Sequence, residues 1–213
     1  MPPVTLNTLM NANTLHPQPG TARAISRDDL NTLPVRRYEG PVTFVDTPAL
    51  LFAALTDIRS EHAVGFDTET RPAFRKGESY LPSIAQIATA RMVYILPLRY
   101  PDTHGVLAEM LQSADIAKSG VALAYDLRTL KQVFAFTEKS IVDLGIVAKR
   151  NGYGQTGVRN LAGIFLGYRI PKSAKTTNWA APRLTPAQII YAATDAWVSR
   201  ELYMKFKDMG ILR

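Results

Sequence analysis

The sequence predicts an α/β domain in which a central mixed β-sheet is flanked by helices. The length of 213 residues corresponds to one domain of ordinary size. Apolar residues make up 46% and charged residues 20%, which is the balance of a globular protein. The predicted strands come first with a helix between them, then a strand–helix pair, and then a run of helices. This order is typical of a sheet with helices on its faces.

The composition excludes several classes of protein. The chain has no cysteine, which excludes a disulfide framework, a cysteine nucleophile and a thiolate-bound zinc ion. No segment approaches the roughly 18 consecutive apolar residues that a membrane span needs. Residues 1–16 lack the Lys or Arg with which a signal peptide begins. We therefore expect a cytoplasmic protein with no membrane partner, and the sequence leaves its oligomeric state open.

The first 40 residues are expected to form an extension to the domain, which then spans residues 41–213. Residues 1–24 are rich in Pro, Asn and Thr without a sustained apolar period, so we expect partial disorder there. Ser26 and Asp29 have the spacing of a capping box, which predicts a short helix over residues 26–33. Pro34 would end that helix.

The domain is expected to begin with a strand over residues 42–45. Thr47 and Pro48 then suit the first positions of a helix that runs to about Arg59. A buried strand is expected over residues 63–68, and the apolar segments 83–89 and 92–96 predict a hairpin. The remaining elements expected along the chain are a helix over 105–112, a strand over 116–120, and helices over 123–134, 143–150, 158–166 and 186–207.

The charge of the chain is unevenly distributed. Residues 1–117 carry a net charge of −2, whereas residues 118–213 carry +9. A basic half favours a polyanionic partner, because Lys and Arg displace counterions from phosphates. A solvated basic surface explains the same charge equally well. Carboxylates that lie within such a positive segment are good candidates for metal binding.

The first acidic motif is Asp67 and Glu69 at the end of the predicted strand 63–68. Residues at i and i+2 of a strand point to the same face, so the two carboxylates lie together. Their oxygens suit a hard divalent cation. Alternatively, the two acids only mark the exit of the strand into solvent.

Two further motifs each add one acid. Asp126 falls in the first turn of the predicted helix 123–134, where the helix dipole alone favours an acid. Tyr191 and Asp195 are four residues apart on the last helix and therefore share a face. Small alanines beside them would let this helix approach another element closely. A surface acid beside a partly buried tyrosine is the alternative for that pair.

Taken together, four acids occupy the edges of three separate elements. Two divalent cations about 4 Å apart need such a set of carboxylates. One cation lowers the pKa of a water molecule, and the other stabilises the leaving oxygen of an in-line displacement. The set is therefore typical of metal-assisted phosphodiester hydrolysis.

The three motifs resemble those of the DEDD 3′–5′ exonucleases in the ribonuclease H-like superfamily, and within them the branch that holds ribonuclease D and the Werner-syndrome exonuclease. Asp67-Thr68-Glu69, the segment 120–126 and the segment 191–196 match the three motifs in order. Tyr191 identifies the tyrosine version, DEDDy, because Ile190 stands where the other version has His. The segments 141–144, 178–179 and 184–185 also resemble this branch. The resemblance implies a ribonuclease H-like (DnaQ-like exonuclease) fold.

The resemblance also implies the activity and its residues. The enzyme would be a 3′–5′ exonuclease with two divalent cations, Mg²⁺ or Mn²⁺. Carried over by position, the metal ligands are Asp67, Glu69, Asp126 and Asp195. Tyr191 would orient the attacking water, because a phenol of pKa about 10 is a poor base at neutral pH.

The sequence leaves the choice of nucleic acid open. We favour DNA, single-stranded or with a recessed 3′ end, because the segment around Trp179 resembles Werner-type domains. RNA trimming and a catalytically silent nucleic-acid-binding module are the alternatives. Phosphate contacts are expected from basic residues in two segments, although solvated loops explain these segments too. The candidate substrate-binding residues are Arg71, Arg75, Lys76, Lys172, Lys175 and Arg183.

Overall fold

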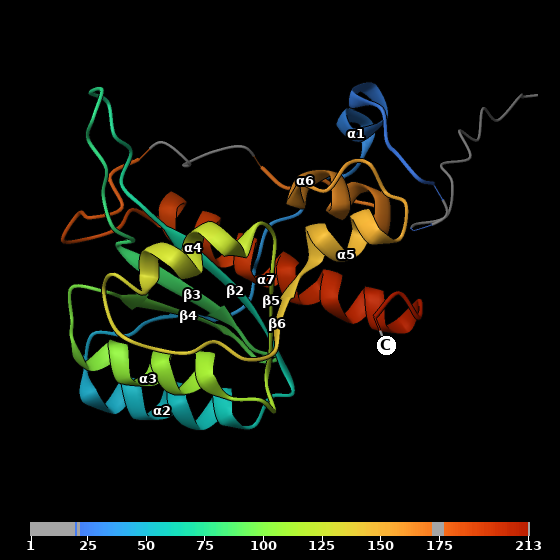
Figure 1. Ribbon diagram of the computed structural model, residues 1–213. Coiled ribbons are helices and arrows are strands. Elements are labelled where there is room, and N and C mark those ends of the chain that lie inside the picture. Colours follow the sequence, from blue (N-terminus) through green and yellow to red (C-terminus); the bar gives the residue numbers. More distant parts are fainter. Residues whose placement is uncertain (1–19, 21, 172–176, 213) are drawn as a thin grey trace, which may run out of the picture.

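The computed structural model describes residues 20, 22–171 and 177–212. Its centre is a six-stranded sheet with the strand order β1-β4-β3-β2-β5-β6 (Figure 1). The strands β2, β3 and β4 pair antiparallel, and the β1–β4, β2–β5 and β5–β6 pairs are parallel. The predicted mixed sheet is therefore confirmed. The strands are β1 (Val42–Phe44), β2 (Ala63–Glu69), β3 (Ile84–Ala88), β4 (Val93–Pro97), β5 (Ala117–Gly120) and β6 (Ile141–Asp143).

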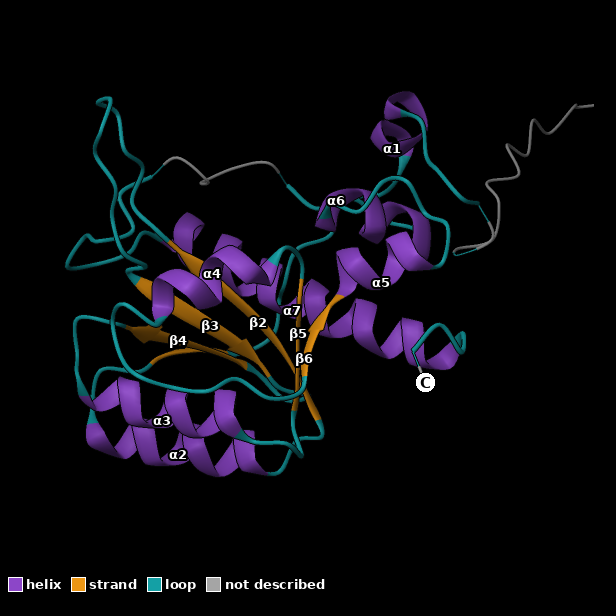
Figure 2. Cartoon of the chain, in the orientation of Figure 1, coloured by secondary structure: helices purple, strands orange, loops and turns teal. Residues whose placement is uncertain are grey.

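Helices cover both faces of this sheet (Figure 2). Helices α2 (Pro48–Arg59) and α3 (Asp102–Gln112) lie side by side, and their apolar side chains share one core with α4 (Leu123–Leu130). The long helix α7 (Pro186–Asp208) crosses the other face over β2, β3, β4 and β5. The remaining elements are α1 (Arg27–Thr32), α5 (Leu144–Arg150), α6 (Val158–Leu161) and the π-helix η1 (Ala162–Leu166).

Local capping explains where several helices begin. The Thr47 side chain accepts a hydrogen bond from the backbone of Leu50, with Pro48 as the first helical residue. Ser26 caps α1 in the same way through Asp29. Thr185 and Gln188 form a full capping box at the start of α7. Each cap satisfies backbone N–H groups that have no partner within the helix.

The structure corrects two element boundaries, one helix type and one missed strand. Helix α3 begins at Asp102 rather than at residue 105, and α4 ends at Leu130 rather than at residue 134. The predicted helix 158–166 is a four-residue α-helix followed by the π-helix η1. The strand β6 was not expected, because its three residues are too few to show an alternating pattern.

The described residues before β1 pack against the C-terminal helices. The backbone of Arg36 donates to the Arg169 carbonyl at 2.9 Å, and Tyr38 donates to the Thr194 hydroxyl at 3.0 Å. The Leu30 side chain lies over Gly163. The division of the chain at residue 40 stays a prediction, and the expected disorder of residues 1–19 lies outside the described residues.

Among the described residues, no helix combines the length and the apolar character that crossing a membrane requires.

Candidate active site

The site lies where β2 ends beneath α7. Gly65, Asp67 and Glu69 alternate along β2, so all three face α7. A Cβ atom on Gly65 would lie 1.9 Å from the Ala196 carbonyl oxygen, so only glycine allows this approach. The close packing brings the Asp195 side chain of α7 over the strand. This agrees with the expectation that small residues let the last helix approach another element.

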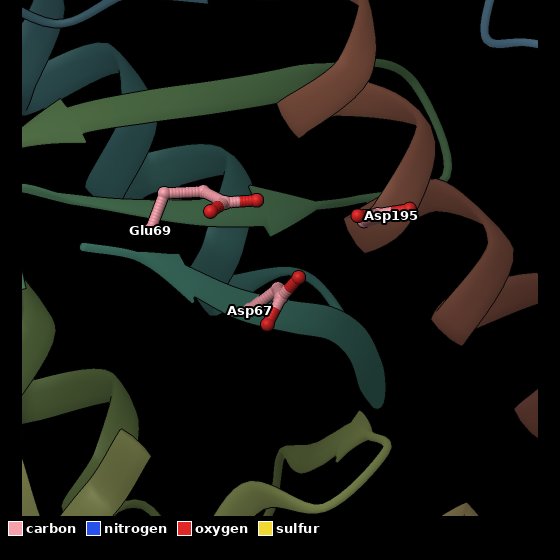
Figure 3. Close-up of side chains that lie close together, drawn as sticks. All are labelled: Asp67, Glu69 and Asp195. Carbon is pink, nitrogen blue, oxygen red and sulfur yellow. The ribbon is translucent and has the colours of Figure 1, made fainter. Parts of the chain in front are cut away.

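Three of the four predicted acids converge at this point. Asp67, Glu69 and Asp195 each offer a carboxylate oxygen, and these oxygens all lie within 4.8 Å of one another. Figure 3 shows Asp195 on its helix, facing Asp67 and Glu69 from the strand. Oxygen atoms at this spacing can share a hard divalent cation.

The electrostatics of Asp67 reflect this crowding. Burial raises the pKa of its carboxyl well above the usual value, and the negative charges of Asp195, Glu69 and Asp126 raise it further. The Thr68 backbone N–H donates to Asp67 Oδ1 at 2.9 Å, which acts in the opposite direction. The cluster therefore favours the uptake of positive charge, either a proton or a cation.

Asp126 approaches the strand from a different direction. It stands in the first turn of α4, which follows β5, and β5 runs parallel to β2. The Thr68 hydroxyl donates to Asp126 Oδ1 at 2.5 Å. The group of three close carboxylates does not include Asp126, although its charge is near enough to raise the pKa of Asp67. Burial raises the pKa of Asp126 too, and the Thr68 hydrogen bond lowers it.

The backbone that delivers Asp126 is strained. Ala122, the N-cap of α4, has a φ of 61°, which is the left-handed region that residues with a side chain rarely adopt. A residue of this kind costs on the order of 1–3 kcal/mol and is enriched at functional sites. Asp143 supports the same turn, since its Oδ2 accepts from the Leu123 backbone at 3.1 Å while Oδ1 caps α5.

Tyr191 lies one helical turn before Asp195 and hydrogen-bonds with its carboxylate. Burial raises the pKa of the Tyr191 phenol, and the charges of Asp195 and Glu69 raise it further. The hydroxyl is therefore protonated at neutral pH. The centroid of the Tyr191 ring lies 6.0 Å from that of Trp179, a buried side chain that is 1% exposed.

Four of the six predicted basic residues fall within the described structure, and two lie outside it. The Arg71 guanidinium stacks on the Tyr80 ring at 3.8 Å, and the Tyr80 hydroxyl donates to Glu78. In the same loop, which rises beyond β2 in Figure 1, Arg75 and Lys76 are exposed. Arg183 is also exposed. Lys172 and Lys175 lie outside the described residues.

Sequence reasoning missed three residues beside the site. Thr68 alternates with Asp67 and Glu69, so its position on the opposite face of β2 could have suggested a contact with another element. Arg159 of α6 is close enough to Tyr191 and Asp195 for their charges to raise its pKa, which burial lowers more strongly. Gln86 of β3 pairs directly with Asp67 across the sheet. Only the fold reveals the last two positions.

Comparisons with known proteins agree with this geometry. A family model described as 3′-5′ exonuclease matches residues 42–211. A 3′-5′ exonuclease from Arabidopsis thaliana is 25% identical over 205 residues, which cover 87% of this chain and 70% of the relative. A ribonuclease D from Gluconacetobacter diazotrophicus is 28% identical over 170 residues, covering 78% of this chain and 42% of the relative. The chain thus spans less than half of the ribonuclease D.

The fold is similar to that of solved exonuclease domains. The crystal structure of the Aedes aegypti Nibbler EXO domain superposes with a TM-score of 0.72 at 22% identity. The alignment covers 82% of this chain and 94% of that domain. The expected ribonuclease H-like fold is confirmed. Because the matched region contains the whole sheet and helix α7, the chain belongs to the 3′–5′ exonuclease family and is a nuclease.

Proposed function

We propose that the protein removes nucleotides one at a time from the 3′ end of a nucleic acid, using two divalent cations. Asp67, Glu69, Asp126 and Asp195 are the proposed metal ligands. The observation that supports this most is the convergence of three carboxylates from β2 and α7 within 4.8 Å. The cations would be Mg²⁺ or Mn²⁺, because both bind preferentially to oxygen ligands such as carboxylates.

The residues fit such cations. Three carboxylates concentrate negative charge where burial already raises the pKa of Asp67, so a cation would relieve their repulsion. The Thr68 hydroxyl fixes one oxygen of Asp126, which holds the fourth carboxylate in one orientation. When bound, divalent cations supply an activated water nucleophile and stabilise the leaving oxygen.

Tyr191 is proposed to position the attacking water. A phenol whose pKa is raised above its ordinary value cannot serve as a base at neutral pH, but its hydroxyl can hold a water molecule in place. The hydrogen bond to Asp195 and the packing against Trp179 hold the ring still. Positioning of this kind contributes to catalysis through orientation.

We propose DNA, single-stranded or with a recessed 3′ end, as the preferred substrate and RNA as the alternative. The loop after β2 supports a single-stranded substrate. Its Phe74 side chain is 82% exposed, and Arg75 and Lys76 follow it. Exposed aromatic and basic groups hold single strands by base stacking and phosphate contact. The Arg71 side chain stacks on Tyr80. Among the described residues of this loop, Arg75 and Lys76 are therefore the basic side chains available to contact phosphate.

A cleavage assay tests the activity and the substrate together. DNA and RNA oligomers labelled at the 5′ end are incubated with and without Mn²⁺, using wild type, Asp126→Ala and the exposed Asp115→Ala. We expect a metal-dependent ladder that shortens from the 3′ end for wild type and Asp115→Ala, and none for Asp126→Ala. Faster shortening of DNA would support the preference. Full activity of Asp126→Ala would contradict the ligand set.

Tyr191→Phe tests the positioning role separately. Removal of the hydroxyl should slow turnover roughly 10- to 100-fold, because the water is no longer oriented. The affinity for Mn²⁺, measured by calorimetry, should stay nearly unchanged, since the phenol is not a proposed ligand. Turnover equal to wild type would contradict this role.

A further inference from the structure

Gln86 is a buried amide directly beside the acidic cluster. In the antiparallel pairing of β2 and β3, Gln86 is the residue opposite Asp67. Directly opposite residues of an antiparallel pair point to the same face of the sheet. Gln86 therefore shares with Asp67 the face that α7 covers. Its partner on the other side, in β4, is the apolar Ile95.

The amide has no hydrogen-bond partner among the described residues. Gln86 is 0% exposed, and neither its Oε1 nor its Nε2 atom forms a hydrogen bond. Leaving a buried polar group unpaired costs about 1–3 kcal/mol. An apolar side chain would avoid this cost, and Ile84, Ile95 and Ala192 form an apolar cluster on the same face. The position thus holds a donor that the described part of the chain does not use.

We propose that Gln86 is a positioning residue for the metal site, whose amide donates a hydrogen bond to the Asp67 carboxylate once the cations are bound. This inference rests on the proposed function. Asp67 already accepts the Thr68 backbone N–H at 2.9 Å, and a second donor would hold the carboxylate in one orientation. Hydrogen-bond donors that orient metal ligands typically change metal affinity or activity 10- to 100-fold when removed.

The test compares Gln86→Met with wild type. Methionine keeps the length of the side chain but has no amide. In EDTA, we expect a melting temperature equal to or above that of wild type, because an unpaired buried group has been removed. The dissociation constant for Mn²⁺, measured by calorimetry without substrate, should rise about 10- to 100-fold. Cleavage should recover as the Mn²⁺ concentration is increased.

Thr89→Val is the matched control in the same region of the sheet. Thr89 is also buried, but its hydroxyl donates at 2.8 Å to Asp57 of α2, which lies on the opposite face of the sheet from α7. This variant should show the opposite pattern, with a lower melting temperature and an unchanged Mn²⁺ affinity. If Gln86→Met resembles Thr89→Val, the role of Gln86 is only structural and the proposal is overturned. Gln86→Leu repeats the measurement should the methionine variant not fold.

Asp195→Asn separates this inference from the proposed function. If Asp195→Asn binds Mn²⁺ as tightly as wild type, the metal site itself is wrong and the inference falls with it. If Asp195→Asn loses Mn²⁺ while Gln86→Met retains wild-type affinity, the site stands and only the inference is overturned. Loss of affinity in both variants supports both proposals.

Discussion

Asp67, a proposed metal ligand, is a residue whose own charge weakens the fold. Its pKa is raised in the folded state by burial and by three neighbouring carboxylates. The unfolded chain releases the proton of this carboxyl at a lower pH than the folded chain does. Between those two pKa values the folded state binds more protons, so the free energy of unfolding falls as the pH rises through this window. Without cations, the crowding of these carboxylates therefore destabilises the fold increasingly as the pH rises.

Asp67→Asn should consequently stabilise the protein in EDTA at neutral pH. Removal of the buried charge is expected to add roughly 0.5–2 kcal/mol, as is common for substitutions that relieve a strained site. Thermal melts in EDTA from pH 4 to pH 8 measure this gain, which should grow with pH. Added Mn²⁺ should raise the melting temperature of wild type but not that of Asp67→Asn. A variant less stable than wild type at pH 7 would show that the acid supports the fold.

Lys118 is a second residue with an unusual charge state. It is 0% exposed in β5, and its Nζ donates to the Ser113 carbonyl at 2.6 Å. Burial lowers the pKa of the amine from 10.5 to about 8. Between these values the unfolded chain binds more protons than the folded chain, so stability rises with pH from about 8 to 10.5.

Lys118→Met should therefore stabilise the protein at pH 7 and flatten this pH dependence. The free energy of unfolding should rise by on the order of 2 kcal/mol. Loss of the hydrogen bond to the Ser113 carbonyl reduces this gain. Urea unfolding at pH 7 and pH 10 measures both effects. The exposed Lys139→Met serves as a control and should change neither value. A steeper pH dependence in Lys118→Met would contradict the assignment.

At the residue scale, the sequence predicts which carboxylates converge better than it predicts the polar residues that lie beside them. Asp67, Glu69 and Asp195 stand out because acids occur at strand or helix spacing beside apolar residues. Thr68 and Gln86 are ordinary polar residues in apolar strands, and only the pairing of β2 with β3 gives Gln86 its place. The spacing of residues along the sequence indicates which of them share a face of one strand or helix. It does not indicate which residue of another strand lies opposite.

At the scale of elements, the contact between β2 and α7 brings the three close carboxylates together. Gly65 removes the side chain that would hold α7 away, and Asp195 reaches the strand as a result. Capped helices such as α2 could be predicted closely, because Thr47 and Pro48 are local signals. The π-helix η1 could not, because the same apolar residues would also suit a regular helix.

Gly65→Ala should destabilise the protein by about 3 kcal/mol or more, since its Cβ would meet backbone that cannot move aside. The matched control is Gly105→Ala in α3, where a Cβ has open space. That change should stabilise by roughly 0.5–1 kcal/mol, because alanine favours a helix over glycine. Urea unfolding measures both. Equal stabilities of Gly65→Ala and wild type would contradict the close approach of α7.

At the scale of the whole molecule, the strand order could not be predicted from the sequence. The hairpin of β3 and β4 is local, whereas β1 pairs with β4 and β2 pairs with β5 across long stretches of chain. The resemblance to a known family implied the fold, whereas the pairing of these strands comes from the structure alone. The packing of residues 22–38 on the C-terminal helices was not expected, because these residues lack a sustained apolar pattern.

Deletion of residues 1–38 tests whether the chain divides at residue 40. The deletion removes the backbone hydrogen bonds of Arg36 and Tyr38 and uncovers apolar surface beside Gly163 and Trp197. We expect the free energy of unfolding to fall by roughly 2–4 kcal/mol from lost apolar burial. Urea unfolding measures the change. An equally stable deletion variant would establish residues 1–40 as a true extension.

The two outermost strands of the sheet, β1 and β6, have three residues each. A strand this short offers too few free amide and carbonyl groups to template the addition of another chain. We therefore expect concentrated solutions to resist fibril growth, and thioflavin T fluorescence should stay at background during prolonged incubation.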